Sequence, residues 1–437
     1  MSLEPIVDWA SLEPSARATV LARPTTENAR VVADTVRELA EAVRSEGDAA
    51  VRRFTARFDG VTQGDLRVTT AEIDAAHAAL TAEQHAALER AVANVERFHA
   101  AQELAPLAVD VMPGVRCERI VRPIGSVGLY VPAGSAPLPS AVIMLAVPAR
   151  LAGCPQRVLC TPPGKDGNAH AAVLVAAKLC GIETIFKIGG AQAIAAMAYG
   201  TESVPKVDKV FGPGNAWVTA AKQYVSGDPA GAALDSPAGP SEVLVIADNR
   251  ATPAYVAADL LAQAEHDTKS HAVLLTDSRR LAEQVHAALG VQAATLSRQD
   301  ILASSLPSIR LVVVDSIERA VALSNAYAPE HLLLQVEDPR RWLESVTCAG
   351  SVFLGDHSPE PLGDYCSGTN HVLPTYGYAR AYSGLSLGDF QKRITVQEVT
   401  AAGLRDLGPT AVVLAGLEGL DAHAGAVSIR LQERAVR

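Results

Sequence analysis

The 437-residue sequence has few aromatic side chains and no excess of basic residues. Aromatic residues make up 4% of the chain, and the hydrophobic fraction of 49% comes mainly from alanine, valine and leucine. Such residues favour helices and close-packed parallel sheets over aromatic-rich sandwiches or stacking platforms for single strands. The 38 Lys and Arg against 48 Asp and Glu give a net charge of −10. Because nucleic-acid binding depends on clustered basic residues, we expect no nucleic-acid partner.

Long apolar runs and paired cysteines are also missing. The most hydrophobic stretch, residues 141–147, stops at Pro148 and is far shorter than the ~20 residues that cross a bilayer. The N-terminus has no basic segment followed by an apolar one, as a secretory signal would. The six cysteines form no CxxC pair and no small-scaffold spacing. We therefore expect a reduced, cytoplasmic chain with no membrane partner.

The hydrophobic pattern divides the chain into a helical first part and a longer α/β part. Apolar residues recur at three- and four-residue intervals between residues 26 and 105, which predicts helices. From Arg157 onward, short β-branched runs alternate with helical segments, which is typical of βαβ units and a parallel sheet. The Gly- and Pro-rich stretch 226–240 interrupts this alternation and marks an internal boundary. After Gly384 the alternation fades into a short terminal appendage with its own helix.

Two nucleotide-binding fingerprints are absent. The sequence contains neither G-x-G-x-x-G nor the P-loop pattern. The nearest match, Gly212-Pro213-Gly214-Asn215-Ala216-Trp217, follows an expected strand and opens an expected helix. Such a turn can bind a phosphate through backbone N–H groups and the helix dipole. A tight βα turn without a ligand explains the same residues equally well.

Polar residues suited to metal binding or proton transfer occur in four places. Gln263 and His266 are three residues apart, so that on a helix their side chains face the same way. Glu330 and His331 follow a proline near an expected strand start, and an adjacent carboxylate and imidazole suit general base chemistry. The other two places are Asp364, in a glycine-punctuated loop, and the C-terminal pair Glu418 and His423.

The residues alone leave several functions open. No HExxH or similar zinc pattern exists, and ligands scattered over 160 residues cannot be assembled from their spacing. Cys154, Cys160 and Cys180 lie in or beside apolar runs and are expected to be packing residues. Cys366 lies near the polar residues, and a thiol can in principle attack an aldehyde. These observations support a cytosolic α/β enzyme that uses a metal or a nucleotide.

Five blocks, taken together and in order, resemble the histidinol dehydrogenase family. They are Phe211–Ala216, Asp235–Glu242, Gln263–Asp267, Ala328–Leu332 and Gly363–Pro374. The resemblance runs nearly end to end. It implies a zinc- and NAD-dependent enzyme of histidine biosynthesis, which oxidises L-histidinol through L-histidinaldehyde to L-histidine while two NAD molecules each accept one hydride.

The resemblance also implies roles for individual residues. The zinc ligands would be Gln263, His266, Asp364 and His423, the last of them supplied by the partner subunit of a homodimer with a shared active site. Glu330 and His331 would be the acid/base pair. Residues that would bind substrate are Ser241, Gln263, His266, His331, Asp364, Glu418 and His423. Residues that would contact NAD are Tyr130, Gln192 and Asn215.

The implied fold is α/β, with two incomplete Rossmann-like domains that are similar to those of aldehyde dehydrogenases. We expect an N-terminal appendage in 1–25 and a discontinuous domain in 26–130 and 242–385 that carries the zinc and acid/base residues. A second domain in 131–241 would carry the NAD contacts, and 386–437 would form a C-terminal appendage that is swapped between subunits.

The chemistry implied by the resemblance agrees with the residue types. We expect His331 to remove the hydroxyl proton and Glu330 to activate water that hydrates the aldehyde, which makes a thiol nucleophile at Cys366 unnecessary. Three alternatives remain. They are another NAD-dependent alcohol dehydrogenase on this scaffold, a zinc hydrolase in which Glu330 activates water, and a binding module without catalytic activity.

Overall fold

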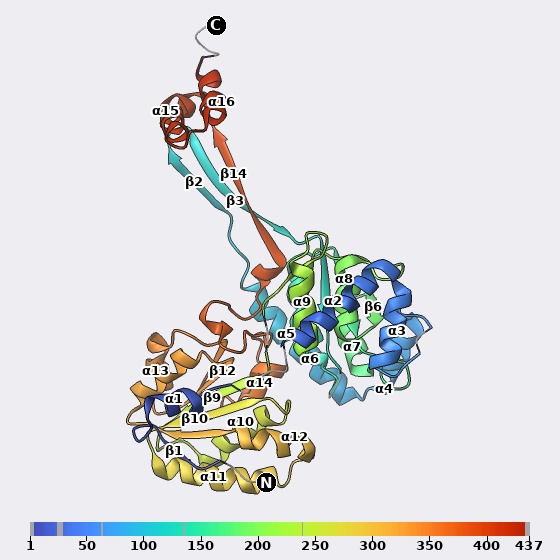
Figure 1. The fold of residues 1–437 in the computed structure, drawn as a ribbon, viewed down its shortest axis with the longest axis vertical. Helices are drawn as coiled ribbons and strands as arrows, with labels where there is room; N and C mark the ends of the chain where they lie inside the picture. Colours follow the sequence, from blue (N-terminus) through green and yellow to red (C-terminus); the bar gives the residue numbers. More distant parts are fainter. Residues whose placement is uncertain (1–3, 24–28, 63, 134–135, 238, 433–437) are drawn as a thin grey trace. The chain divides into compact units, whose positions relative to one another are not determined.

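A computed structural model describes residues 4–23, 29–62, 64–133, 136–237 and 239–432 (Figure 1). The chain forms two compact units. The first consists of Met1–Gln102 and Ile124–Phe390, and the second of Glu103–Pro123 and Gln391–Arg437. The first unit contains two parallel sheets, and the second contains one antiparallel sheet.

The first parallel sheet has five strands in the order β6-β5-β4-β7-β8. Its strands are β4 (Ser126–Tyr130), β5 (Gln156–Thr161), β6 (Thr184–Lys187), β7 (Lys209–Phe211) and β8 (Ala233–Leu234). Counted along the chain, the order is third, second, first, fourth, fifth, as in a Rossmann fold that stops one strand short. The strand order reverses between β4 and β7, which are direct neighbours. A crevice for a ligand is therefore expected at the carboxyl ends of these two strands.

Eight helices cover this sheet. They are α2 (Ala29–Glu46), α3 (Asp48–Phe58), α4 (Thr70–Ala79), α5 (Ala82–Ala100), α6 (Pro139–Leu151), α7 (Ala171–Leu179), α8 (Gly190–Tyr199) and α9 (Ala216–Ser226). One hydrophobic core joins the sheet to α4, α5, α6 and α7, and another joins it to α2, α3, α8 and α9. Both faces of the sheet are thus covered, which is why its strands read as continuous apolar runs.

The second parallel sheet has six strands in the order β1-β11-β10-β9-β12-β13. They are β1 (Val7–Asp8), β9 (Glu242–Ala247), β10 (His271–Thr276), β11 (Arg310–Val313), β12 (His331–Gln335) and β13 (Ser351–Leu354). Without the short edge strand β1, this sheet repeats the order of the first. Every residue of β9, β10 and β12 is buried.

Helices and short 3-10 turns complete the first unit, and the last of these turns packs against α6 in the core of the first sheet. The helices are α1 (Pro14–Val20), α10 (Pro253–Ala264), α11 (Arg279–Ala293), α12 (Gln299–Ser305), α13 (Ile317–Tyr327) and α14 (Glu360–Tyr365). The 3-10 turns are η1 (Leu306–Ser308), η2 (Pro339–Ser345), η3 (Tyr378–Arg380) and η4 (Leu387–Phe390).

The second unit is a three-stranded antiparallel sheet followed by two helices. The strands β2 (Leu107–Met112), β3 (Val115–Pro123) and β14 (Gln391–Val399) lie in the order β14-β3-β2, and the helices are α15 (Ala401–Leu417) and α16 (Asp421–Gln432). Large apolar side chains on these helices are exposed, among them Val413, Leu414, Leu417 and Ile429. In the part of this unit that the structure describes, the buried hydrophobic residues are Val115 and Ala415.

The predicted α/β class with two incomplete Rossmann-like sheets is confirmed. The chain passes from the first sheet to the second near the predicted break at 226–240, since β8 ends at Leu234 and β9 begins at Glu242. Several domain limits differ from those expected. The helices between 29 and 100 and strand β4 belong to the first sheet and not to the second, because their apolar faces pack against β4 to β7.

The expected terminal appendages differ in a similar way. Strand β3 pairs with β14 along nine residues, so residues 107–123 join the C-terminal segment and not the zinc-carrying domain. At the N-terminus, β1 pairs with β11 and extends the second parallel sheet, so this segment is part of the sheet.

Candidate active site

Glu330 and His331 lie at the amino end of β12, which stands between β9 and β13 in the second sheet. His331 opens the strand and is opposite Val243 of β9, so the two strands begin side by side. Helix α13 ends just before them at Ala328, which has a left-handed backbone with φ of 55°, and Pro329 prevents the helix from continuing. Both residues are buried, with Glu330 5% and His331 3% exposed.

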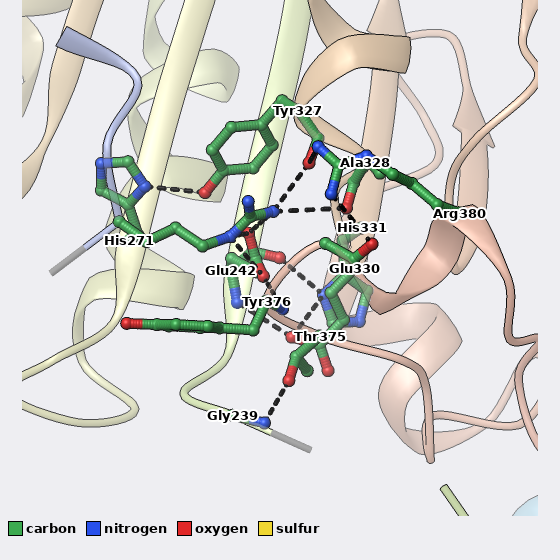
Figure 2. A network of polar contacts seen from close by, with 12 residues as sticks. Gly239, Glu242, His271, Tyr327, Ala328, Glu330, His331, Thr375, Tyr376 and Arg380 are labelled. Atoms are coloured by element: carbon green, nitrogen blue, oxygen red, sulfur yellow. Dashed lines mark hydrogen bonds and ion pairs between the residues drawn. The ribbon is translucent and has the colours of Figure 1, made fainter. Parts of the chain in front are cut away.

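The backbone of Glu242 holds both of these side chains (Figure 2). Its N–H donates to Oε2 of Glu330 at 2.9 Å, and its carbonyl oxygen lies 3.2 Å from Nδ1 of His331. Oε2 of Glu330 is 3.8 Å from the same ring nitrogen. The carboxylate and the imidazole therefore have fixed positions relative to one strand end.

Helix α14 brings two more carboxylates to His331. Glu360 and Asp364 are four residues apart on one face of this short helix. Oδ1 of Asp364 lies 3.3 Å from Nε2 of His331, and Oε1 of Glu360 lies 3.9 Å from Nδ1. A side chain at Gly363 would overlap the ring of Phe353, so glycine lets the helix approach β13 closely.

A group of side chains suited to a metal ion lies beside this pair. His266, Glu360 and Asp364 each offer a ligand atom, and these atoms lie within 4.8 Å of one another. Gln263, one turn before His266, is fully buried, and neither its amide oxygen nor its amide nitrogen has a hydrogen-bond partner among the described residues. Burying an amide without hydrogen-bond partners lowers the stability of the fold by about 1–3 kcal/mol. A metal ion bound by the amide oxygen of Gln263 would offset part of this loss.

The electrostatics of the group depend on burial and on the close carboxylates. Burial raises the pKa of Glu330 well above its ordinary value and raises the pKa of Glu360 to about 8. Burial opposes the charged form of His331, but the carboxylates of Glu360, Glu330 and Asp364 outweigh it and raise its pKa. For Asp364 the neighbouring His331 outweighs burial and lowers the pKa.

The donor set fits a zinc ion. Desolvation of the ring lowers the pKa of His266, although the residue is exposed, and this favours the neutral imidazole that can donate a lone pair to a metal. Zinc ions in proteins are commonly bound by imidazole nitrogen and carboxylate oxygen atoms. The amide oxygen of Gln263, which has no hydrogen-bond partner among the described residues, would add a neutral ligand. The residues present in this unit therefore supply an imidazole, an amide and carboxylates, without any thiolate.

The other expected cluster lies at the carboxyl ends of β4 and β7, where the order of the first sheet reverses. Tyr130 ends β4, and its hydroxyl accepts a hydrogen bond from the N–H of Gly190 at 3.0 Å. Gly212 follows β7 with φ of 127°, and any side chain there would overlap the carbonyl oxygen of Tyr130. Gln192 is buried, with Nε2 3.4 Å from Oδ2 of Asp59. Burial raises the pKa of Asp59 to about 6.

Asn215 is the N-cap of α9. Its Oδ1 accepts hydrogen bonds from the N–H groups of Trp217 and Val218, both at 3.1 Å. The residue is exposed, so its amide nitrogen remains available to a ligand at the helix N-terminus. The structure thus gives Asn215 a local role in the helix and leaves its second function open.

The remaining predicted residues are divided between the two units. Ser241 immediately precedes β9 and is half-buried. Glu418 and His423 belong to the second unit, where both are exposed. The other predicted metal, acid/base and substrate residues belong to the first unit, as do the predicted NAD contacts. The cysteines are unpaired, and Cys366 is half-buried.

Sequence reasoning missed Glu360, His371 and the role of Glu242. Glu360 stands between two prolines, four residues before Asp364, and this i,i+4 spacing was the available signal. His371 is half-buried, and its buried Nε2 has no hydrogen-bond partner among the described residues. Desolvation lowers its pKa, on which Asp364, His331 and His266 also act. For Glu242, no pattern in the sequence links it to Glu330.

Known proteins resemble this chain over nearly its whole length. The family model for histidinol dehydrogenase matches residues 21–431. A histidinol dehydrogenase of Xanthomonas euvesicatoria pv. vesicatoria is 57% identical over 98% of this chain and 99% of its own length. One from Aliivibrio fischeri is 55% identical over 98% of this chain and 96% of its own length.

A solved structure agrees with these sequence relatives. The crystal structure of histidinol dehydrogenase from Elizabethkingia anophelis superposes with a TM-score of 0.93 at 46% identity, and the alignment covers 98% of both chains. A search of the helices in the described residues finds none with the length and apolar character needed to span a bilayer.

Proposed function

Because the chain belongs to the histidinol dehydrogenase family and is thus an oxidoreductase, we propose that it oxidises L-histidinol to L-histidine in histidine biosynthesis. The reaction would pass through L-histidinaldehyde, with two molecules of NAD and one zinc ion. The observation that carries this proposal is the group of His266, Glu360, Asp364 and His331, which lies beside the buried amide of Gln263 that has no hydrogen-bond partner among the described residues. A group of this kind is suited to binding a metal and moving protons.

The zinc ligands in this proposal are Gln263, His266, Asp364 and His423 of the partner subunit. Bound zinc would orient the imidazole and amine of histidinol, and bound NAD would accept a hydride from the substrate carbon in each of two steps. Ser241, His331 and Glu418 would complete the substrate contacts, together with the four metal ligands. Glu360 belongs to the same group of candidate ligand atoms and could contact the same ion.

His331 would act as the base in both oxidations. Its Nδ1 faces the carbonyl oxygen of Glu242 at 3.2 Å, which favours a proton on Nδ1 and leaves Nε2 as the basic nitrogen. Nε2 would take the hydroxyl proton of histidinol as the C–H bond gives up its hydride. Glu330 would remove a proton from the water that adds to the aldehyde, and Nε2 would then take a hydroxyl proton of the resulting hydrate.

The dinucleotide would lie at the carboxyl ends of β4 and β7. Tyr130, Gln192 and Asn215 lie around this reversal point, and the positive N-terminal ends of the α8 and α9 dipoles would favour a pyrophosphate there. The N–H groups of Gly190, Trp217 and Val218 are already bonded to Tyr130 and Asn215. The negative net charge of the chain does not oppose this, because phosphates can be neutralised locally by such helix ends.

The proposal includes a homodimer in which each active site uses the partner's His423. It also places the protein in the cytosol. The exposed apolar side chains of α15 and α16 support a second copy as their cover, because patches of this kind mark interfaces. Free cysteines support a reducing compartment.

One assay tests the reaction. Purified protein is incubated with L-histidinol and NAD, and NADH and histidine are counted, with an expected ratio of two NADH per histidine. His331→Asn should lower kcat by ~10²–10⁴, the range for loss of a positioned general base. The matched control is His357→Asn, an exposed histidine after β13, which should keep full activity. Absence of histidine as a product, or oxidation of a different alcohol instead, would overturn the proposal.

A further inference from the structure

Arg23 and Glu242 form an ion pair next to the acid/base residues Glu330 and His331, which the backbone of Glu242 contacts. Nε of Arg23 donates to both carboxylate oxygens of Glu242, at 3.1 and 2.9 Å, and Nη2 lies 2.7 Å from Oε2. The side chains are 14% and 1% exposed, so water competes little for the pair. The backbone N–H of Tyr376 donates to the same carboxylate. A buried carboxylate is thus held by a guanidinium and a backbone amide.

Arg23 also holds the turn that leads into Glu330. Nη2 donates to the carbonyl oxygens of Tyr327, at 2.9 Å, and of Ala328, at 3.3 Å. The guanidinium carbon lies 3.9 Å from the centre of the Tyr327 ring, which is a close cation–π contact. The Tyr327 hydroxyl lies 2.7 Å from Nδ1 of His271, so the ring itself is fixed (Figure 2).

Two strained residues lie next to this ion pair. Ala328 and Tyr376 are non-glycine residues with φ of 55° and 58°. Such conformations cost about 1–3 kcal/mol each and persist only where the surroundings impose them. The carbonyl of Ala328 is bound by Arg23 and the N–H of Tyr376 by Glu242, so the ion pair contributes to both constraints.

Glu242 connects the ion pair to the acid/base residues. The side chain binds Arg23, while the backbone of the same residue binds Glu330 and faces His331. We propose that Arg23 and Glu242 are positioning residues for Glu330 and His331, with the ion pair fixing both the start of β9 and the turn before β12. The proposal rests on the proposed function only for its kinetic consequence, since the positioning is a property of the fold.

The chemistry of Arg23 makes the proposal specific. A guanidinium is planar, can bind a carboxylate with two donors, and can stack on an aromatic ring at the same time. A lysine could supply the charge but not the fork or the stacking. Arg23→Lys should therefore be an intermediate variant, and Arg23→Met, which keeps a similar length without charge, should be the stronger one.

The matched control is Arg53, which forms a comparable pair on the surface of the same unit. Its Nη1 and Nη2 contact the two oxygens of Glu46 at 2.5 and 3.0 Å, and its guanidinium lies 5.2 Å from the ring of Phe54. Both side chains of that pair are about half exposed. Arg53→Met thus removes a similar interaction without any link to Glu330.

The kinetic test uses the full-length, zinc-loaded enzyme with L-histidinol and NAD. We expect Arg23→Met to lower kcat by roughly 100-fold, as for a displacement of about 1 Å at the reacting groups, with each KM changed less than threefold. Arg23→Lys should recover about tenfold of that loss, and Arg53→Met should behave as the wild type. A kcat for Arg23→Met equal to that of Arg53→Met would overturn the proposal, as would a loss explained by a smaller folded fraction in circular dichroism.

Hydrogen exchange provides a second readout that does not depend on activity. In Arg23→Met the amides of residues 326–328, 330–332 and Tyr376 should exchange faster than in the wild type, and in Arg53→Met they should not. If the wild type fails to oxidise histidinol, the proposed function fails while this measurement still decides the positioning. Unchanged exchange at these amides would overturn the positioning itself. If Arg23→Met does not fold, Arg23→Lys serves for both measurements, with a smaller expected effect.

Discussion

Lys222 and Asp235 form a buried ion pair that braces the turn after β7. Nζ of Lys222 lies 2.5 Å from Oδ1 of Asp235, and each side chain is only 3% exposed. The same ammonium donates to the carbonyl oxygen of Gly212 at 2.9 Å, and the N–H of Gly212 donates to Oδ2 of Asp235 at 2.8 Å. Both backbone groups of this glycine are thus held by the two charges.

Lys222→Met should lower both stability and dinucleotide binding. Leaving Asp235 buried without its cation costs about 3–5 kcal/mol, measured as the free energy of unfolding in urea. The released turn should raise the KM for NAD by roughly tenfold, which corresponds to about 1.4 kcal/mol. Lys178→Met is the control, because its pair with Asp74 is more than half exposed and should contribute less than about 1 kcal/mol. An unchanged KM for NAD in Lys222→Met would show that this ion pair does not support dinucleotide binding.

His271 should make the protein less stable in acid. Burial lowers its pKa to about 3, with Arg310 and Arg23 adding to the effect. The unfolded chain takes up a proton on this residue near pH 6.5 and the folded chain does not, so stability falls as the pH drops below 6.5. Between pH 8 and pH 5 this histidine should account for about 2 kcal/mol of lost stability.

The measurement compares urea unfolding of the wild type and His271→Gln across this pH range. Glutamine can still reach the Tyr327 hydroxyl, which contacts Nδ1 of His271 at 2.7 Å, and it does not titrate. The variant should therefore lose less stability than the wild type on acidification. His357→Gln, at an exposed position, should follow the wild type. Parallel curves for the wild type and His271→Gln would contradict the prediction.

Zinc should stabilise the folded protein through Asp364. A ligand that binds only the folded state at 100 times its Kd adds about 2.7 kcal/mol, so the chelated wild type should melt at a higher temperature after zinc is added. Asp364→Asn removes the carboxylate charge and should abolish most of this shift. Asp356→Asn, a neighbouring carboxylate outside the metal group, should retain it. A zinc-dependent shift of equal size in Asp364→Asn would exclude Asp364 as a ligand.

Mixed dimers test whether the site is shared between subunits. His423→Ala and His331→Asn should each be inactive as pure proteins. In a heterodimer one of the two sites would contain both intact residues, so mixing should restore up to about a quarter of wild-type activity for a random mixture. Heterodimer formation is verified with two distinct affinity tags. Formation of heterodimers without any regained activity would argue against a contribution of His423 to the partner's site.

The alternation of β-branched runs with helical segments predicted most strands of the two parallel sheets, but not the strands that lack a β-branched run between helices. The strands β5, β6, β7, β9, β10, β11 and β13 were recognisable because β-branched runs stood between helical segments, whereas β8 fell inside the predicted break at 226–240. Strand β4 was missed as an element, since its five residues include Ser126 and Gly128 and follow another strand without a helix between. Strands β2 and β14 are almost wholly exposed, so they lack the alternation of a half-buried strand.

The candidate site could be predicted only in part, for a similar reason. Gln263 and His266 share a local spacing, and so do Glu330 and His331, but spacing does not connect the two pairs. Their assembly depends on the parallel register of β9 with β12, which is a long-range property of the sheet. Arg23 lies 219 residues before Glu242, and no periodicity extends over such a distance. The family resemblance predicted roles for individual residues. The fold showed that Glu360, Arg23 and Glu242 also belong to the surroundings of the candidate site.

The sparse interior of the second unit has a consequence for how the protein behaves on dilution. Three strands and two helices with so few buried apolar side chains gain little free energy from their own packing. We expect most of that free energy to come from apolar surface covered by another chain, so mass action enters the folding equilibrium of this unit. Diluting the protein would then act on α15 and α16 as a mild denaturant does, while the two parallel sheets, with cores of their own, remain folded.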